Sequence, residues 1–172
     1  GTLDQKPSLL ARLDVVVASV HSKLRMTSAQ MTPRMIAAIS NPHTDILGHC
    51  TGRLVNVSGK REVPPERGTR PPSEFDADLV FAACAQFGVA VEINSRPERL
   101  DPPKRLLRLA VEAGCLLSID TDAHAPGQLD WQANGCERAT RCGVQSDSVV
   151  NTWTERDLLA WTADHAARPM RG

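Results

Sequence analysis

Two carboxylates and an imidazole follow an apolar run in the stretch Leu116–His124, which reads Leu-Leu-Ser-Ile-Asp-Thr-Asp-Ala-His. In parallel α/β sheets, functional side chains gather where the strands end, so Asp120, Asp122 and His124 are candidates for catalysis or cation binding. Asp122 and His124 are two residues apart, which places both side chains on the same side of an extended segment. We therefore expect Asp122 and His124 to reach one small cluster of ions.

Histidines end two further apolar runs. The β-branched run 14–21 ends at His21, and the shorter run 45–49 ends at His49. A single histidine at the end of a strand is more often structural, but its recurrence at several strand ends favours a shared site. Imidazole and carboxylate groups are the ligands that zinc, manganese and iron use in proteins.

A third apolar run, 89–94, carries Glu92 and Asn94 near its end. Glu92 and Asp120 are each open to two interpretations, because either could orient a ligating histidine or be an ordinary charge at a strand end. His43 and His165 lie outside these runs, and we expect both to be exposed and without a role in the site.

Helical patterns alternate with the apolar runs. Runs without polar alternation are typical of strands covered on both faces, as in a parallel sheet. Thr32 before Pro33 and Ser73 before Asp76 are predicted to begin helices. The predicted strands are 14–21, 45–49, 89–94, 116–120 and a short one at 149–150; the predicted helices are 7–12, 33–39, 73–88, 103–114, part of 129–142 and 154–161. The fold class is α/β, with parallel strands in a wound sheet or barrel.

Composition limits the function classes. The chain has 172 residues, 41% hydrophobic and 23% charged, with 20 basic and 20 acidic side chains. That suits one domain, 1–164 with a tail at 165–172, and gives no global charge to attract nucleic acid or membrane. No run is long enough to span a membrane, so a soluble cytoplasmic protein is expected. The five cysteines are irregularly spaced and expected to be reduced.

The segment 50–72 combines glycines and prolines with basic residues and is predicted to be a long irregular loop. Its basic side chains could follow a phosphate backbone, although solvated loop charges are the commoner meaning. These residues are Arg53, Lys60, Arg61, Arg67 and Arg70.

An alternative site centres on Cys50. Residues 48–52, Gly-His-Cys-Thr-Gly, follow a predicted strand and have the spacing of a nucleophile elbow. Such an elbow must enter a helix at once, whereas this one enters the irregular loop. Asp122 and His124 are also too close in sequence to align as the acid and base of a triad. We therefore favour a metal site over a cysteine hydrolase as the interpretation of these residues.

Four segments in order resemble motifs of the PHP (polymerase and histidinol phosphatase) domain family, in particular the PHP domains of bacterial family X DNA polymerases and related free-standing PHP proteins. The segments are Ala-Ser-Val-His-Ser at 18–22, Asp-Ile-Leu-Gly-His at 45–49 with Thr-Gly-Arg at 51–53, Glu-Ile-Asn at 92–94 with Pro97 and Arg-Leu-Asp at 99–101, and Thr-Asp-Ala-His at 121–124.

The resemblance implies a phosphoesterase built on a distorted (β/α)7 barrel, with up to three divalent cations (zinc, manganese or iron) at the strand ends. Asp122 and His124 would be catalytic residues and cation ligands. The full set of implied ligands is His21, His49, Asp122 and His124, and the implied substrate contacts are Arg53, Asn94 and Arg99.

The first motifs of the family have no counterpart here, since no histidine precedes His21. The chain therefore resembles the C-terminal half of a PHP domain, and we expect the missing half from another polypeptide or a homo-oligomer to complete the site. The expected substrate is a phosphate ester, either a DNA end or abasic site or a small molecule of the histidinol phosphate kind. A non-catalytic structural or interaction module is the remaining alternative.

Overall fold

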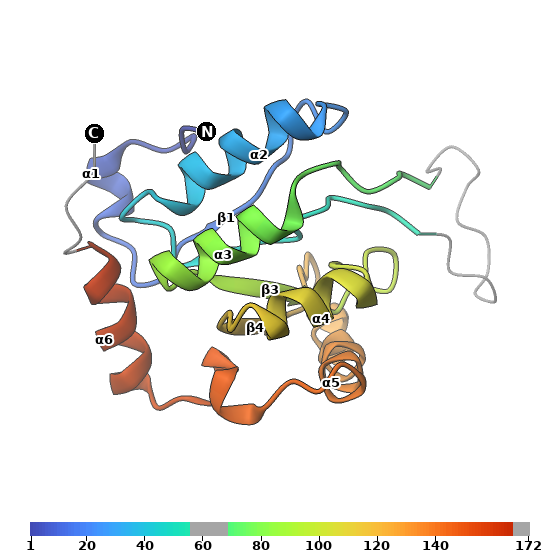
Figure 1. Ribbon diagram of the computed structural model, residues 1–172. Helices are drawn as coiled ribbons and strands as arrows, with labels where there is room; N and C mark the ends of the chain where they lie inside the picture. The colour runs from blue at the N-terminus through green and yellow to red at the C-terminus, as the bar shows by residue number, and fades with distance from the viewer. Residues whose placement is uncertain (56–68, 167–172) are drawn as a thin grey trace.

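A computed structural model describes residues 1–55 and 69–166, and four parallel strands in the order β1-β2-β3-β4 form its sheet (Figure 1). This confirms the predicted α/β class with helices between parallel strands. Lys60, Arg61, Arg67 and the tail beyond residue 166 lie outside the described residues. The elements are α1 Pro7–Leu10, β1 Val17–Ala18, α2 Ser28–Ile39, β2 Ile46–Leu47, α3 Ala77–Phe87, β3 Ala90–Asn94, α4 Lys104–Glu112, β4 Leu117–Asp120, α5 Gln132–Arg141, α6 Glu155–Ala166 and the 3-10 turns η1 Pro126–Trp131, η2 Ser146–Ser148 and η3 Val150–Thr152.

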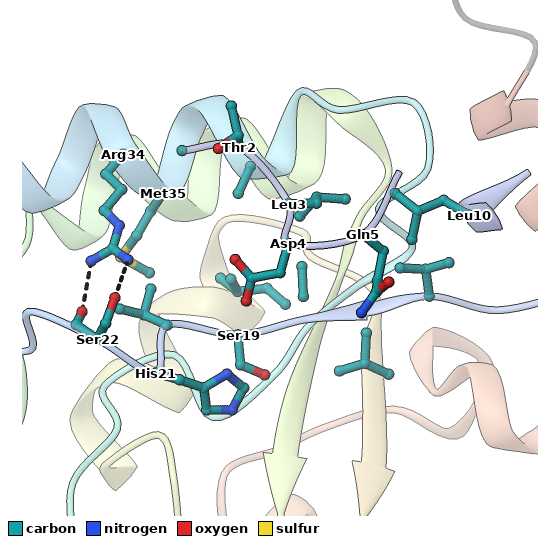
Figure 2. Close-up of a pocket in the computed structure, with 17 residues that line it drawn as sticks. Thr2, Leu3, Asp4, Gln5, Leu10, Ser19, His21, Ser22, Arg34 and Met35 are labelled. Carbon is teal, nitrogen blue, oxygen red and sulfur yellow. Dashed lines mark hydrogen bonds between the residues drawn. The ribbon is translucent and has the colours of Figure 1, made fainter. Parts of the chain in front are cut away.

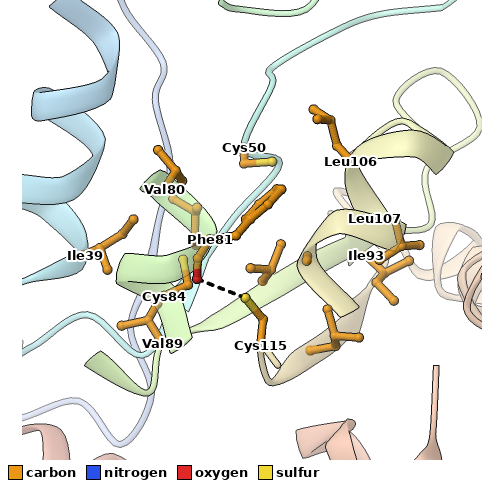
Figure 3. Close-up of a cluster of buried hydrophobic side chains, with 14 of the residues drawn as sticks. Ile39, Cys50, Val80, Phe81, Cys84, Val89, Ile93, Leu106, Leu107 and Cys115 are labelled. Atoms are coloured by element: carbon orange, nitrogen blue, oxygen red, sulfur yellow. Dashed lines mark hydrogen bonds between the residues drawn. The ribbon is translucent and has the colours of Figure 1, made fainter. Parts of the chain in front are cut away.

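The two faces of the sheet pack against different partners, because successive side chains of a strand point to opposite faces. One face joins the larger apolar cluster with α2, α3 and α4, where Phe81, Cys84 and Leu107 lie with Ile93 of β3 (Figure 3). On the other face, Ile46 and Ala90 pack with Val150 and residues of α6. The sheet-face residues of the larger cluster are Leu47, Val91, Ile93, Leu117 and Ile119.

The strands β1 and β2 are shorter than the predicted runs 14–21 and 45–49. Next to β1, the backbone N–H of Val16 donates to a side chain instead of a neighbouring strand, because Asp45 Oδ2 accepts it at 2.7 Å. The extended runs therefore exist, but only their central residues form the ladder. Within the described residues the sheet is open, and Val17 on the edge strand β1 is 51% exposed.

Two predicted helix starts are wrong. The helix α2 begins at Ser28 with Thr27 as its N-cap, and Gln30 Oε1 accepts the Thr27 N–H at 3.4 Å. Pro33 lies inside the helix, not at its first position. The N-cap of α3 is Asp76, whose Oδ1 accepts the Leu79 N–H at 3.1 Å. These local bonds satisfy amide donors that the first helical turn leaves free.

The segments outside the four strands differ from prediction in two places. Val149 forms one isolated bridge with Leu117, and the chain then turns into η3 instead of continuing as a strand. Leu54 and Arg70 form an antiparallel bridge at the base of the loop that was predicted to be irregular throughout. All five cysteines are free thiols, as predicted. None of the helices in the described ranges is long and apolar enough to cross a membrane.

His165 was predicted to be exposed at the start of a frayed tail, and this is wrong. It lies in the last turn of α6 with 2% of its surface exposed. Its Nδ1 donates to Asp45 Oδ1 at 2.9 Å, and its ring lies edge-on to Trp161. Because the other oxygen of Asp45 accepts the Val16 N–H, one buried carboxylate connects α6 to the edges of β1 and β2.

We expect His165→Ala to lower the free energy of unfolding by about 2–4 kcal/mol, because it leaves a cavity and removes a buried hydrogen bond from Asp45. Urea denaturation followed by circular dichroism measures the change. His43→Ala is the matched control, since His43 is only half-buried, and its effect should stay within about 0.5 kcal/mol. Equal effects of the two substitutions would show that the Asp45–His165 contact contributes nothing specific.

Candidate functional site

His21 and His49 meet at the carboxyl ends of β1 and β2. Their ring centroids are 5.1 Å apart and their planes cross at 69°. Arg34 of α2 fixes the turn after His21 by donating to the Ser22 carbonyl at 2.8 Å and to its hydroxyl at 3.1 Å. In Figure 2, His21 and Ser19 lie along a pocket of about 330 Å³ that is bounded on the other side by the segment of Asp4. The parallel register therefore brings together two imidazoles that are 28 residues apart in sequence.

The imidazole of His49 is held in its neutral form. The residue is 7% exposed, and its Nδ1 is buried without a hydrogen-bond partner among the described residues. Burial, and after it the positive charge of Arg99, lower the pKa of His49 to about 4. A neutral imidazole at neutral pH keeps a nitrogen lone pair, which is the form that binds a cation.

A buried carboxyl of β3 holds the turn that carries His49. Glu92 Oε2 accepts the His49 backbone N–H, and Asn94 Nδ2 donates to Glu92 Oε1 at 3.1 Å. Burial raises the pKa of Glu92 to about 8. His49 has a positive φ of 22°, so this hydrogen bond supports a backbone conformation that a non-glycine residue rarely adopts.

Asn94, a predicted substrate contact, is fully buried in the structure. Besides donating to Glu92, it accepts the Arg96 N–H with Oδ1 at 3.1 Å. Its amide therefore braces the carboxyl and the start of the loop after β3. On the neighbouring strand, Asp120 accepts from Ser118 Oγ at 2.6 Å, and burial raises the pKa of Asp120. Asp120 is thus also bound within the sheet.

Asp122 and His124 follow β4 and are linked through the backbone. The Nδ1 of His124 lies 2.7 Å from the Asp122 carbonyl oxygen. A carbonyl oxygen only accepts, so Nδ1 of this exposed ring carries a proton; the lone pair of the neutral ring then lies on Nε2. The Asp122 carboxylate pairs with Arg99, whose Nε lies 2.9 Å from Oδ2. Among residues 1–55 and 69–166, no hydrogen-bond partner contacts Nε2 of His124, so the catalytic role of Asp122 and His124 stays a prediction.

The half-buried Arg53 and the buried Arg138 fix the loop that presents Arg99. Arg53, a predicted substrate contact, donates its Nε to the Arg99 carbonyl at 2.9 Å and its Nη2 to the Leu100 carbonyl. Arg138 of α5 donates to the carbonyl oxygens of Asn94, Asp101 and Pro102. No local sequence signal marks Arg138, because its partners lie 36 to 44 residues away.

Asp101 anchors the same loop from inside the protein. Its Oδ2 accepts from Thr51 Oγ1 at 2.7 Å, and its Oδ1 accepts the Thr51 N–H at 3.2 Å. The Cys50 thiol lies against this carboxyl and is 2% exposed. Burial and the nearby charge of Asp101 raise the pKa of Cys50 well above its ordinary value. A buried thiol that stays protonated is no nucleophile, which argues against the cysteine hydrolase.

The predicted ligands are of the residue types that bind divalent cations, but they do not surround one position. Imidazole and carboxylate groups are the ligands of zinc, manganese and iron. The structure brings them to one edge of the sheet as two pairs, His21 with His49 and Asp122 with His124. Within residues 1–55 and 69–166, no three or more His, Cys, Asp or Glu side chains lie close enough to hold one ion.

Comparisons with known proteins find relatives of two kinds. The chain is 33% identical over 161 residues to the DNA polymerase/3'-5' exonuclease PolX of Bacillus subtilis, covering 94% of this chain and 26% of that protein. It is 26% identical over 161 residues to a probable phosphatase of Thermoanaerobacter sp., covering 88% of this chain and 58% of the relative. A probable phosphatase of Vibrio parahaemolyticus is 27% identical over 167 residues, covering 92% and 60%.

No family model matches the sequence. The similarity to both PolX and probable phosphatases supports the relationship to the PHP family that the four motifs indicate. The chain spans only about a quarter of the Bacillus protein and less than two thirds of these phosphatases.

Glu92 should make the free energy of unfolding fall as pH rises through neutrality toward about 8. Its pKa rises from an ordinary 4.5 to about 8 in the folded chain. Between these values the folded chain keeps a proton that the unfolded chain has lost, so the free energy of unfolding falls as pH rises. His49 contributes the opposite slope, but only below its ordinary value of 6.5. Between pH 6.5 and about 8 only the Glu92 slope remains, so we expect Glu92→Gln to flatten the fall in the free energy of unfolding over that range.

Urea denaturation of chelator-treated protein across this pH range measures the slope. Glu98→Gln is the control, because Glu98 pairs with Arg96 in the loop after β3 and should leave the slope unchanged. A Glu92→Gln variant that declines as steeply as the parent would show that another group binds the proton.

Proposed function

We propose that this chain forms part of a divalent-cation-dependent phosphoesterase. The observation that carries the proposal is the state of His49, whose buried imidazole is neutral, lies against His21 and has no partner for Nδ1 in the described part of the chain. Desolvating an imidazole without hydrogen-bonding both nitrogens is costly, and a ligand for one of its nitrogens would offset that cost. The names of the relatives, an exonuclease and probable phosphatases, agree with phosphate-ester hydrolysis.

In this proposal, His21, His49, Asp122 and His124 hold zinc, manganese or iron. A bound cation would lower the pKa of a water ligand and offset the charge that develops on a phosphate. The side chains of the protein keep the ligands in place. Glu92 fixes the His49 turn, and the Asp122 carbonyl engages His124 Nδ1, which leaves Nε2 as the ligand atom of this proposal.

Two substrate branches follow from the relatives. PolX is named as a DNA polymerase and 3'-5' exonuclease, which favours DNA ends or abasic sites. The probable phosphatases favour a small phosphate monoester. The proposed site lies at the end of the sheet from which the basic loop emerges, and Arg70 at its base donates to the Gly52 carbonyl at 2.6 Å. That position favours the DNA branch.

A non-catalytic module is the second candidate. It is favoured by the arrangement of the ligands as two pairs without a closed group of three in the described part of the chain. In either case we propose that another polypeptide strand completes the sheet at β1, where Val15 and Val17 are 36% and 51% exposed. Such a strand would pair with the backbone of the edge strand β1 and bring further cation ligands to the site.

We expect His49→Ala to lose most of its Mn²⁺ binding and, with it, phosphoesterase activity. Isothermal titration and hydrolysis of a 3'-labelled oligonucleotide and of p-nitrophenyl phosphate, each with and without Mn²⁺, provide the readouts. Loss of a residue that only orients a ligand typically weakens metal binding by about 10–100-fold, so removing the ligand His49 should weaken it at least as much. His43→Ala is the control and should behave like the parent.

The comparison of substrates separates the candidates. Activity mainly on the oligonucleotide supports the DNA branch, and activity mainly on the monoester supports the small-molecule branch. Stable folding with Mn²⁺ binding but no turnover of either substrate would favour the non-catalytic module. Unchanged Mn²⁺ binding in His49→Ala would contradict the proposed ligand set.

We also expect the purified chain to associate through β1. Light scattering after size-exclusion chromatography should give a mass above that of the 18.7 kDa monomer. Val17→Lys places a charge on the exposed edge strand and should shift the mass toward the monomer. Leu129→Lys is the control, since Leu129 is exposed in η1 away from the sheet edge. A monomer for the parent chain would contradict this expectation.

A further inference from the structure

The carboxylate of Asp122 already has a positively charged partner within the protein. Arg99 Nε lies 2.9 Å from Asp122 Oδ2, and the two side chains are 15% and 21% exposed. The pair is therefore largely shielded from water. A charge interaction is stronger in such surroundings than at the exposed surface. Arg99 occupies one oxygen of the carboxylate that the proposed function assigns to a cation.

The guanidinium of Arg99 is incompletely satisfied. Its Nη1 is buried, and no hydrogen-bond acceptor contacts it among residues 1–55 and 69–166. A buried donor without an acceptor is costly, particularly when it is charged. The remaining donor of this fork is thus available for an anion, and a phosphate is the anion whose paired oxygens match a guanidinium.

Backbone hydrogen bonds fix the loop of Arg99, whereas the ion pair with Asp122 holds its guanidinium. Arg53 Nε donates to the Arg99 carbonyl at 2.9 Å, and Arg138 donates to the Asp101 carbonyl at 3.4 Å on the same loop. The loop therefore holds the Cα of Arg99 near both Asp122 and His49. With its Cα held, an arginine side chain moves its guanidinium by changes of rotamer alone.

We infer that Arg99 couples cation binding to phosphate binding: it opposes a cation at Asp122 until a phosphate oxyanion draws its guanidinium away. This inference rests on the proposed cation site. A guanidinium beside Asp122 repels a divalent ion and competes for the carboxylate, so removing its charge must tighten cation binding. Because coupling between two ligands is reciprocal, phosphate must tighten cation binding in the parent chain.

A purely structural role for Arg99 makes the opposite prediction. If Arg99 only holds Asp122 in the orientation that a cation needs, loss of the guanidinium weakens cation binding. The sign of the change therefore separates the two roles without any measurement of turnover.

The experiment titrates the full chain with Mn²⁺, with and without inorganic phosphate, and counts free Mn²⁺ by its electron paramagnetic resonance signal. A protein-free titration corrects for Mn²⁺ bound directly by phosphate. We expect Arg99→Gln to bind Mn²⁺ on the order of tenfold more tightly than the parent without phosphate. Phosphate should tighten binding to the parent by on the order of tenfold and leave Arg99→Gln within about twofold.

Two further variants complete the test. Arg99→Lys keeps the charge and should bind Mn²⁺ as weakly as the parent without phosphate, which excludes a general loss of structure as the cause. Arg96→Gln is the matched control, because Arg96 lies on the same loop but pairs with Glu98, 3.3 Å away. Its Mn²⁺ affinity and phosphate response should equal those of the parent.

The outcomes distinguish this inference from the proposed function. Mn²⁺ binding that is unchanged or weaker in Arg99→Gln would overturn the coupling while leaving the cation site in place. Absence of Mn²⁺ binding in the parent and in Arg99→Gln alike would overturn both.

Discussion

A hydrogen bond from the backbone N–H of His49 to the buried carboxyl of Glu92 connects two neighbouring strand ends. It keeps the turn after β2 in a conformation with positive φ and places the His49 ring beside His21. The same carboxyl accepts from Asn94, whose other amide atom accepts from the loop that carries Arg99. The imidazole pair and the Arg99–Asp122 pair thus depend on one buried carboxyl in the middle of the sheet.

Burial sets the electrostatics of this edge of the sheet. It lowers the pKa of His49 and raises those of Glu92, Asp101 and Asp120, so water exclusion favours the neutral form of each group. Arg99 and Asp122 instead satisfy each other as an ion pair. A site built in this way presents the neutral imidazole of His49 together with one charge pair, and we propose that a cation and a phosphate exchange partners with that pair.

The predicted ends of β3 and β4, at Asn94 and Asp120, are confirmed, because an apolar run that leads into a polar side chain is a local signal, whereas β1 and β2 end before the predicted runs do. The order of the strands and the meeting of His21 with His49 follow from that signal and from parallel pairing. The predicted start of α2 is wrong because proline is common in the first turn of a helix, whereas here Pro33 lies inside the helix and Thr27 is the N-cap. His165 was misjudged because its partner, Asp45, is 120 residues away in sequence. Sequence spacing likewise could not show that Arg53 binds backbone carbonyls, that Arg138 braces the loop, or that Arg99 holds Asp122.

The central claim is that this edge of the sheet binds a divalent cation. Anomalous X-ray diffraction at the manganese absorption edge, from crystals of the chain soaked in Mn²⁺, tests it most directly. The account predicts an anomalous peak in contact with the His49 ring and adjacent to Asp122 or His21. A manganese peak elsewhere on the molecule, with none at these side chains, would contradict it.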